Sequence, residues 1–435
     1  MPSCLSRTHP ANKPNVNLPL YIARKFYGGY GDQTSRPRAS APAVRIATIG
    51  VALGLAVMIV SVGIVRGFKQ EINRKLYGFS AHAQVVDIRS FVQPDQYGIA
   101  VDSSFISRIT QLQGVERVQR FAEKMGVLKT EEEFEAILLR GIAPEYDTHF
   151  LEESIVDGAL PNYADSASNN QIVISQTHAS ALHLAVGDKV YAYFFEETVK
   201  MRRFTIAAIY QTNVKQYDQH MAVVPMSVVQ RLNEWEPNTV SGVEMYSDQK
   251  LPMTDWTELL TEQAEPLLAE NLTEQKMVVG LNENPRTMQV VSWLSLLDMN
   301  IWLILVLVAL VAVFSMSAGL LILILERTSD IGLLCAIGMS TRHIRTSFLY
   351  YAAFIVVRGL IWGNLIGCSL LWVQQRFGLV QLDPATYYVR VLPVDMNVWL
   401  ILLLNLATFA VTLLALIIPS LLVERIQPAR AIRFD

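Results

Sequence analysis

The apolar residues of this chain gather into four long runs that polar segments separate. Residues 46–65, 299–325 and 398–423 contain no charged side chain, and residues 347–373 contain only Arg358. At about 1.5 Å of rise per residue, each run is long enough as a helix to cross about 30 Å of hydrocarbon. The pattern therefore predicts a membrane α-helical protein with four transmembrane helices. Their predicted bounds are 46–67, 298–325, 347–374 and 398–423.

Charge divides the chain into an acidic block and basic flanks. Residues 68–298 hold 19 Lys and Arg against 32 Asp and Glu, a balance of −13, while the remainder holds 17 against 7, a balance of +10. With both termini in the cytoplasm, the inner flanks of the runs carry eleven Lys or Arg and the outer flanks carry seven, which favours that orientation. The acidic block then forms one large domain outside the cytoplasm, and we expect no nucleic-acid partner.

The segments that flank the runs are shorter. We predict a cytoplasmic N-terminal segment at 1–45, in which residues 17–27 have the apolar periodicity of an amphipathic helix lying along the inner leaflet. A frayed tail is the alternative for these residues. A short loop on the side opposite the cytoplasm is predicted at 375–397, and a cytoplasmic tail at 424–435.

The acidic block alternates strand and helix patterns, which predicts a large α+β domain between the first and second membrane helices. We assign an α+β core to residues 68–141 and 242–297, and an inserted β-rich subdomain to residues 142–241. The core ends in a stalk helix at 284–297 that leads into the second span. The predicted strands are 83–88, 118–128, 134–140, 171–175, 189–195, 202–210, 221–224, 242–246 and 276–281, and the predicted helices are 102–113 and 254–269.

The sequence contains no motif for chemistry of its own. Neither G-x-x-x-x-G-K-[ST] nor H-E-x-x-H occurs, so we expect no catalytic residue, no metal site and no ATPase in this chain. No Asp or Glu lies in any apolar run, so proton- or sodium-driven transport has no relay. We single out Arg358, Asn364 and Asn405 as intramembrane polar residues. We expect Arg358 to make a structural contact with either asparagine, with a backbone carbonyl or with a subunit partner.

Two further patterns lie at the apolar runs. Gly50-x-x-x-Gly54 in the first run, and glycines at 359, 363 and 367 in the third, form small-residue stripes that predict close helix packing within a bundle or across a dimer. After the second run, residues 326–346 predict a short amphipathic helix at the inner face. Ile331, Leu334 and Ile337 share one side of this helix, and Gly338 ends it. An ordinary loop needs neither feature, so we interpret the helix as a surface that another protein grips.

Residues 326–340 resemble the signature E-R-T-x-E-I-G-[IL]-L-x-A-[LI]-G-[AM]-S of the FtsX/MacB-like ABC permeases, and depart from it at Asp330 and Cys335. Within that superfamily, the chain is similar to the lipoprotein-releasing permeases LolC and LolE. The shared features include the lead helix at 22–26, Gly67-Phe68, the histidine at 82, and the ending P-A-x-A-I-R at 428–433. The turn between residues 195 and 204 is short, which resembles the hookless LolE type.

The resemblance implies a non-catalytic permease subunit of the bacterial inner membrane with a MacB-like periplasmic core. Such a subunit pairs with a second permease, as a homodimer or heterodimer, and with two copies of a separate ATPase that binds ATP and Mg, so no cofactor is expected in this chain. Its substrate is a lipoprotein, and a periplasmic lipoprotein carrier is a further partner. The implied ATPase-coupling residues are Glu326, Arg327, Asp330, Ile331, Gly332, Leu334, Ile337 and Gly338. Acyl chains would be held by Val51, Leu55, Met58 and Val62 of the first span, facing the second span.

We therefore predict that the chain couples ATP hydrolysis by its partner to the mechanical extrusion of lipoproteins toward the outer membrane. Two alternatives are kept. The first is a MacB-like efflux or stress permease. The second is an FtsX-like signalling scaffold that controls a cell-wall hydrolase, against which the size of the outer domain argues.

Overall fold

A computed structural model describes residues 18–28, 40–93, 96–195, 198–248, 250, 253–269, 274–326 and 328–420. The chain forms two compact units. The helical unit comprises Met1–Arg66, Asp298–Gly378 and Val394–Asp435, and the sheet unit comprises Gly67–Leu297 and Leu379–Pro393. The predicted tail at 424–435, the ending at 428–433, the last residues of the fourth predicted span and Arg327 lie outside the described residues.

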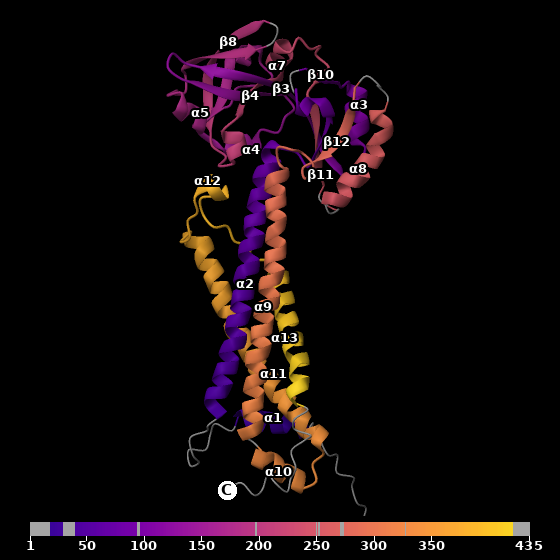
Figure 1. The fold of residues 1–435 in the computed structure, drawn as a ribbon, viewed down its shortest axis with the longest axis vertical. Helices are drawn as coiled ribbons and strands as arrows, with labels where there is room; N and C mark the ends of the chain where they lie inside the picture. Colours follow the sequence, from indigo (N-terminus) through magenta and orange to yellow (C-terminus); the bar gives the residue numbers. More distant parts are fainter. Residues whose placement is uncertain are drawn as a thin grey trace, which may run out of the picture. The chain divides into compact units, whose positions relative to one another are not determined.

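Four long helices dominate the chain (Figure 1), and each contains a stretch long and apolar enough to cross a membrane. They are α2 (Ser40–Phe79), α9 (Met288–Glu326), α11 (Thr341–Phe377) and α13 (Val398–Ser420). The predicted fold class, four membrane helices with a large mixed α/β domain between the first two, is confirmed. The predicted stalk is the first part of α9, because that helix continues unbroken into the second apolar run.

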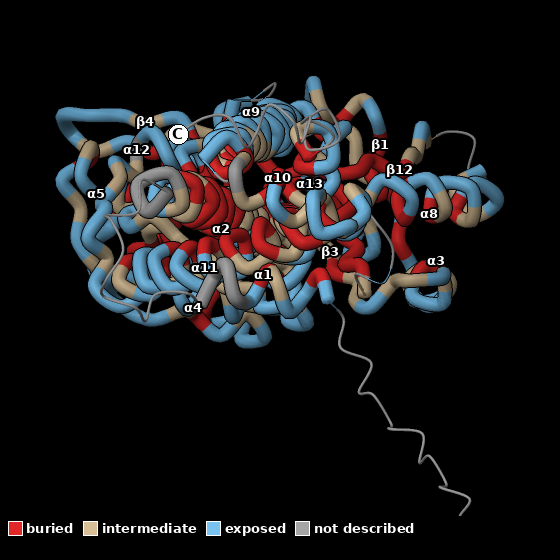
Figure 2. Tube along the Cα trace, turned by 90° about the horizontal axis from the view of Figure 1, so that it is seen from below, coloured by how far each residue is buried: buried red, intermediate tan, exposed pale blue. Residues whose placement is uncertain are grey.

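Two short helices complete the helical unit. The N-terminal helix α1 (Leu18–Gly28) packs against α11, and its Ala23 is fully buried there. Helix α10 (Thr328–Ala336) lies between α9 and α11 along the chain. Half of the most apolar stretch of α2 is buried, whereas the buried share is 28% for α9 and 17% for α13. Figure 2, seen from below, shows this difference between α2 and α9. The exposed apolar surface of α9 and α13 is therefore free to contact lipid or another subunit.

Glycines set the spacing between α2 and its neighbours. A Cβ atom placed on Gly359 of α11 would lie 2.9 Å from the Val51 Cβ, and one on Gly363 would lie 2.8 Å from the Ala52 carbonyl oxygen. On another side of α2, a Cβ on Gly50 would lie 2.9 Å from the Ser315 Cβ of α9. Only residues without a side chain permit these approaches, so the predicted close packing is confirmed within this chain. We call the contact between α2 and the glycines of α11 the glycine seam.

The sheet unit contains a ten-stranded sheet in the order β12-β1-β11-β3-β4-β9-β6-β8-β5, in which β7 pairs with both β3 and β8. Helices α3 (Ser103–Thr110) and α8 (Met253–Leu268) contribute buried apolar residues to the core of this sheet. The strands are β1 (Ala83–Asp87), β3 (Val115–Lys129), β4 (Phe134–Ile142), β5 (Ile155–Gly158), β6 (Gln171–Ser175), β7 (Lys189–Phe195), β8 (Val199–Tyr210), β9 (Met221–Pro225), β11 (Gly242–Ser247) and β12 (Lys276–Gly280); the short strands β2 (Ile99–Ala100) and β10 (Thr239–Val240) pair with each other. The short helices are α4 (His149–Glu153), α5 (Gln176–Ala181), α6 (Lys215–Asp218), α7 (Met226–Leu232) and α12 (Pro384–Tyr387).

Six strands close into a ring, because β3 pairs with β4, β4 with β9, β9 with β6, β6 with β8, β8 with β7, and β7 again with β3. Phe194 and Phe204 are fully buried in its core. The strands of the predicted insertion at 142–241 therefore share β3 and β4 with the predicted core, and no gap in hydrogen bonding separates the two. The length of β3 is the reason: its start pairs with β11, and its end, at residues 127–129, pairs with β7.

We expect Gly363→Val to destabilise the helical unit, because its Cβ would collide with a backbone oxygen of α2, which cannot move aside. Overpacking of this kind typically costs about 1–3 kcal/mol. Thermal unfolding of the full chain in detergent measures the loss. Ser369→Val, on an exposed face of the same helix, is the matched control and should leave the unfolding temperature unchanged. Equal unfolding temperatures for both variants would contradict the seam.

Candidate functional site

The segment that links α9 to α11 ends its helix at a glycine. Gly338 has φ +92°, a left-handed conformation that favours glycine. Its N–H donates to the Cys335 carbonyl (3.0 Å), and the Met339 N–H donates to the Leu334 carbonyl (3.0 Å). These bonds satisfy the last carbonyl groups of α10, as expected of a helix C-terminus. A short helix that ends at this glycine is present as predicted, but it spans only Thr328–Ala336, because Glu326 ends α9 and residues 341–346 begin α11.

The apolar residues of α10 divide between two sides. Ile331 is buried in a cluster with Ile344 and Phe348 of α11. Leu334 packs partly on this cluster, and Gly332 is buried. By contrast, Ile337 is 73% exposed. The prediction that Ile331, Leu334 and Ile337 form one free face is therefore wrong, because the bundle uses the side that carries Ile331.

Leu333 is the residue that sequence reasoning missed. It is 62% exposed and lies four positions before Ile337, so both side chains face the same way one turn apart. The 3.6-residue period identifies the two sides of a short helix, but only the packing of α11 shows which side is free. We call Leu333 and Ile337 the α10 knob. Among the polar residues predicted nearby, Glu326 is exposed and Asp330 is half-buried.

The predicted acyl-chain residues of α2 are all buried: Val51, Leu55, Met58 and Val62 are each less than 7% exposed. Val51 and Leu55 lie against Gly359 and Gly363 of α11. The expectation that these two residues face the second span is therefore wrong. The side of α2 that meets α9 carries Gly50 and Gly54 instead. An acyl chain could reach Val51 only if α2 and α11 separated.

The intramembrane asparagines pair with each other rather than with Arg358. The Asn364 Nδ2 donates to the Asn405 Oδ1 (2.7 Å), and the Asn405 Nδ2 donates to the Asn364 Oδ1 (2.9 Å), which joins α11 to α13. Arg358 is exposed and makes no hydrogen bond or ion pair with the part of the chain that the structure describes. The expected contact between Arg358 and either asparagine is therefore wrong; a contact with a subunit partner stays a prediction.

A double-mutant cycle measures this amide pair. We expect Asn364→Leu and Asn405→Leu to destabilise the chain separately, and the double variant to lose less than the sum of the two. Hydrogen-bonded polar pairs between membrane helices couple by about 0.6 kcal/mol on average and about 1.7 at most. Thermal unfolding in detergent provides the values, and strict additivity would contradict the pairing.

In the sheet unit, a buried ionic network connects three strands to the start of α9. The Arg140 guanidinium of β4 donates to the Glu123 carboxylate of β3 (2.6 Å) and to the Glu244 carboxylate of β11 (2.5 Å). Arg286, two residues before α9 begins, donates to the other oxygen of Glu123 (2.7 Å). The Tyr146 hydroxyl donates to Glu244 (2.8 Å). We call these five residues the ionic network.

The charges of the network compensate one another, with Glu123, Arg140 and Glu244 buried and Arg286 at the exposed edge. Burial alone would raise the pKa of Glu123, but the positive charges of Arg286 and Arg140 outweigh it and hold that pKa below its ordinary value. Burial raises the pKa of the Tyr146 phenol, so it remains a donor. Sequence reasoning missed this network, because a charged residue in a strand is expected to face solvent. The sequence separation between its members gives no indication of the pairing.

We expect Glu123→Gln to destabilise the sheet unit by about 3 kcal/mol, because the buried Arg140 and the partly exposed Arg286 lose one counter-charge. The lowered pKa of the Glu123 carboxyl also determines the direction in which stability changes with pH. The stabilisation is fully present above the ordinary Glu pKa of about 4.3 and is lost as the pH falls below it, through the lower folded-state value. The free energies of unfolding of wild type and variant should therefore differ at pH 7 and approach each other at pH 3. Unfolding of the full chain at both pH values measures this difference. The exposed Glu258→Gln is the control.

Two models of known protein families match separate parts of the chain. Residues 302–428 match the FtsX-like permease C-terminal model, and residues 46–258 match the MacB-like periplasmic core domain. Similar relatives are the lipoprotein-releasing system transmembrane proteins LolC of Xylella fastidiosa (24% identity, 89% of this chain and 92% of that one) and LolE of Haemophilus influenzae (23%, 96% and 99%). LolC of Neisseria meningitidis is 22% identical over 90% of this chain and 94% of its own.

Two solved structures resemble the chain in part. The periplasmic region of MacB from Actinobacillus actinomycetemcomitans is 14% identical, covers 50% of this chain and 95% of its own, and has a TM-score of 0.34. The extracellular domain of the transporter YknZ is 16% identical, covers 45% and 96%, and has a TM-score of 0.32. The family models and the relatives confirm the predicted resemblance.

Proposed function

We propose that this chain, an FtsX-like permease with a MacB-like periplasmic core domain between its first two apolar helices, extrudes lipoproteins from the inner membrane toward the outer membrane. The observation that carries the proposal is that relatives named as lipoprotein-releasing permeases align with about nine-tenths of the chain. The four apolar helices and these relatives indicate a multi-pass protein of the inner membrane. Cytoplasmic N- and C-termini remain part of the proposal.

The energy for extrusion comes, in this proposal, from a separate ATPase subunit, present in two copies, that binds ATP and Mg. The α10 knob is the contact for it, since two large apolar side chains are exposed on a short helix whose other side is fixed to α11. Glu326 and Asp330 give this contact a polar rim. Arg327, which the resemblance also implies, lies between α9 and α10 in the sequence.

The force then travels along α2 and α9. Both helices run without a break from residues of the helical unit to residues of the sheet unit, and the ionic network attaches the start of α9 to three strands. A buried network with matched charges resists partial opening, so a shift of α9 is passed to the sheet as a whole. This chain contributes no bond-making step.

Release of a lipid-anchored protein requires a place for its acyl chains. We propose that the glycine seam opens during the cycle and exposes Val51 and Leu55, with Met58 and Val62 continuing the same apolar path. The exposed apolar sides of α9 and α13 are where a second permease, of the same or a different kind, would pack. A periplasmic lipoprotein carrier would accept the released cargo.

A MacB-like efflux or stress permease is the second candidate, favoured by the match of residues 46–258 to the MacB-like core. An FtsX-like scaffold that controls a cell-wall hydrolase is the third. Purification of the assembly in detergent separates them: a bound triacylated protein supports release, and a bound hydrolase supports the scaffold.

We expect the double variant Leu333→Asp, Ile337→Asp to lose its ATPase subunit, because two carboxylates would have to be desolvated at the contact. Co-purification from cells measures binding, and ATP-dependent release of palmitate-labelled lipoprotein from proteoliposomes measures function. Leu379→Asp replaces an equally exposed leucine of the sheet unit, at 69%, and should retain both. An assembly that stays intact with aspartate in the α10 knob would refute the assigned contact.

A further inference from the structure

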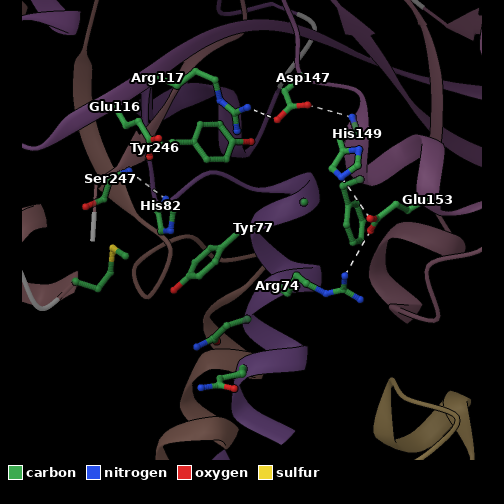
Figure 3. A pocket seen from close by; sticks show the side chains of 15 residues that line it. Arg74, Tyr77, His82, Glu116, Arg117, Asp147, His149, Glu153, Tyr246 and Ser247 are labelled. Carbon is green, nitrogen blue, oxygen red and sulfur yellow. Dashed lines mark hydrogen bonds and ion pairs between the residues drawn. The ribbon is translucent and has the colours of Figure 1, made fainter. Parts of the chain in front are cut away.

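A pocket of about 780 Å³ in the sheet unit has no role in the mechanism above. It lies between the end of α2, the starts of β3 and α8, the end of β11 and helix α4. Its aromatic lining consists of Tyr77, Tyr246 and Phe150. We call it the His82 pocket, after the histidine that Figure 3 shows between Tyr77 and Tyr246.

His82 is held in one orientation and one protonation state. It is 3% exposed, and its ring lies 4.0 Å from that of Tyr77 and 5.7 Å from that of Tyr246, between centroids. The Ser247 N–H donates to its Nδ1 (3.1 Å). Burial, and then the charge of Arg117, lower its pKa to about 4, so the imidazole is neutral at neutral pH. With Nδ1 accepting, the single ring proton is on Nε2.

That proton has no acceptor. The His82 Nε2 is buried and makes no hydrogen bond to any residue that the structure describes. The Arg117 Nε is a second buried donor in this state, although its Nη1 pairs with Asp147 and its guanidinium lies 4.2 Å from the Tyr246 ring centroid. Buried donors without acceptors are rare in folded proteins and are expensive to retain. Two of them in one pocket wall mark a place at which a bound group can supply the acceptors.

The charges of the lining limit the class of ligand. Arg117 pairs with Asp147, and Arg74 pairs with Glu153 (3.4 Å), so no cation is free to hold a phosphate or sulfate. Glu116 is exposed at the pocket and makes no hydrogen bond or ion pair with the described part of the chain. Two donors without acceptors, aromatic walls and one exposed acid suit a chain of carbonyl acceptors with apolar and basic side chains.

We propose that the His82 pocket binds an extended polypeptide segment, whose backbone carbonyls accept from the His82 Nε2 and the Arg117 Nε. Its side chains lie against Tyr77, Tyr246 and Phe150, and a basic side chain approaches Glu116. Resting on the proposed function, the natural occupant is the polypeptide part of the lipoprotein, bound while its acyl chains are held elsewhere.

The space for this segment depends on a glycine. A Cβ atom on Gly78 would lie 2.2 Å from the Phe150 ring, so only glycine allows Phe150 of α4 to lie this close to the end of α2. Phe150 therefore forms a wall of the pocket instead of being displaced into it. Figure 3 shows His149 and Glu153, which begin and end α4, across the pocket from His82.

The test uses a fluorescein-labelled, unlipidated dodecapeptide of Gly, Ser and Val with one Lys, and the full chain in detergent. We expect saturable binding, measured by fluorescence anisotropy. His82→Asn should weaken binding about tenfold, equivalent to about 1.4 kcal/mol, because the Asn Oδ1 can still accept from Ser247 while the Nε2 donor is lost. His178→Asn, which changes another buried histidine whose two ring nitrogens both have partners, should not weaken it. Replacing the peptide Lys with Glu should weaken binding to the wild type.

A second measurement does not depend on the folding of the His82 variant. A benzophenone amino acid in place of Gln70, an exposed residue of the pocket lining, should crosslink to the peptide, while the same group at the exposed Val156 should not. No binding to the wild type, or equal binding to His82→Asn, overturns the pocket. If ATP-driven lipoprotein release persists in that case, the proposed function stands without it. If the peptide binds as expected but no lipoprotein is released, the pocket stands and the proposed cargo fails.

Discussion

The structure of the helical unit depends on the glycine seam. Between helices in hydrocarbon, burial of apolar surface provides no driving force, because lipid tails are as apolar as the side chains they replace. Close backbone approach and polar pairs must hold the bundle instead. Gly359 and Gly363 allow that approach to α2, and the paired amides of Asn364 and Asn405 fix α11 to α13. Helix α11 is therefore the element to which α1, α2, α10 and α13 are all attached.

In the sheet unit, the ionic network holds the strands and the chain entering α9 together. Water competes for every exposed polar contact, so a lasting connection between the strands and the chain entering α9 needs buried charges with counter-charges. The Glu123 carboxylate lies between two guanidinium groups, one from the sheet and one from the chain that enters α9. Loss of either cation leaves the desolvation cost of the buried Glu123 carboxylate only partly offset. This all-or-none behaviour suits a part that transmits movement.

The sequence predicted the elements of this protein better than their partners. Long uncharged runs can only be membrane helices or very large cores, and strand alternation from residue 118 onward identified β3 and β4. Periodicity, however, does not say what a face meets. Val51 and Leu55 were placed toward α9 because nothing in the α2 sequence distinguishes the side that meets α11. Leu333 was overlooked for the same reason, since the burial of Ile331 depends on Phe348, seventeen positions later.

Buried polar residues were the second kind of failure. Glu123 and Arg140 look like surface charges in their own strands, and their pairing depends on the register between β3 and β4. The sequence offers His82 only as a feature shared with a family, and its missing acceptor is visible only in the folded pocket. By contrast, Gly338 was predicted correctly, because the conformation that ends a helix is a local property of the chain.

The closed ring of strands has a consequence for how the chain can be cut. A module that folds separately can be gained or lost by cutting the chain at its two ends, but this ring takes two of its six walls from the hairpin of β3 and β4. Its removal would leave that hairpin projecting with unpaired backbone on both sides. Deletion of the ring from this chain would therefore also require shortening of the hairpin itself.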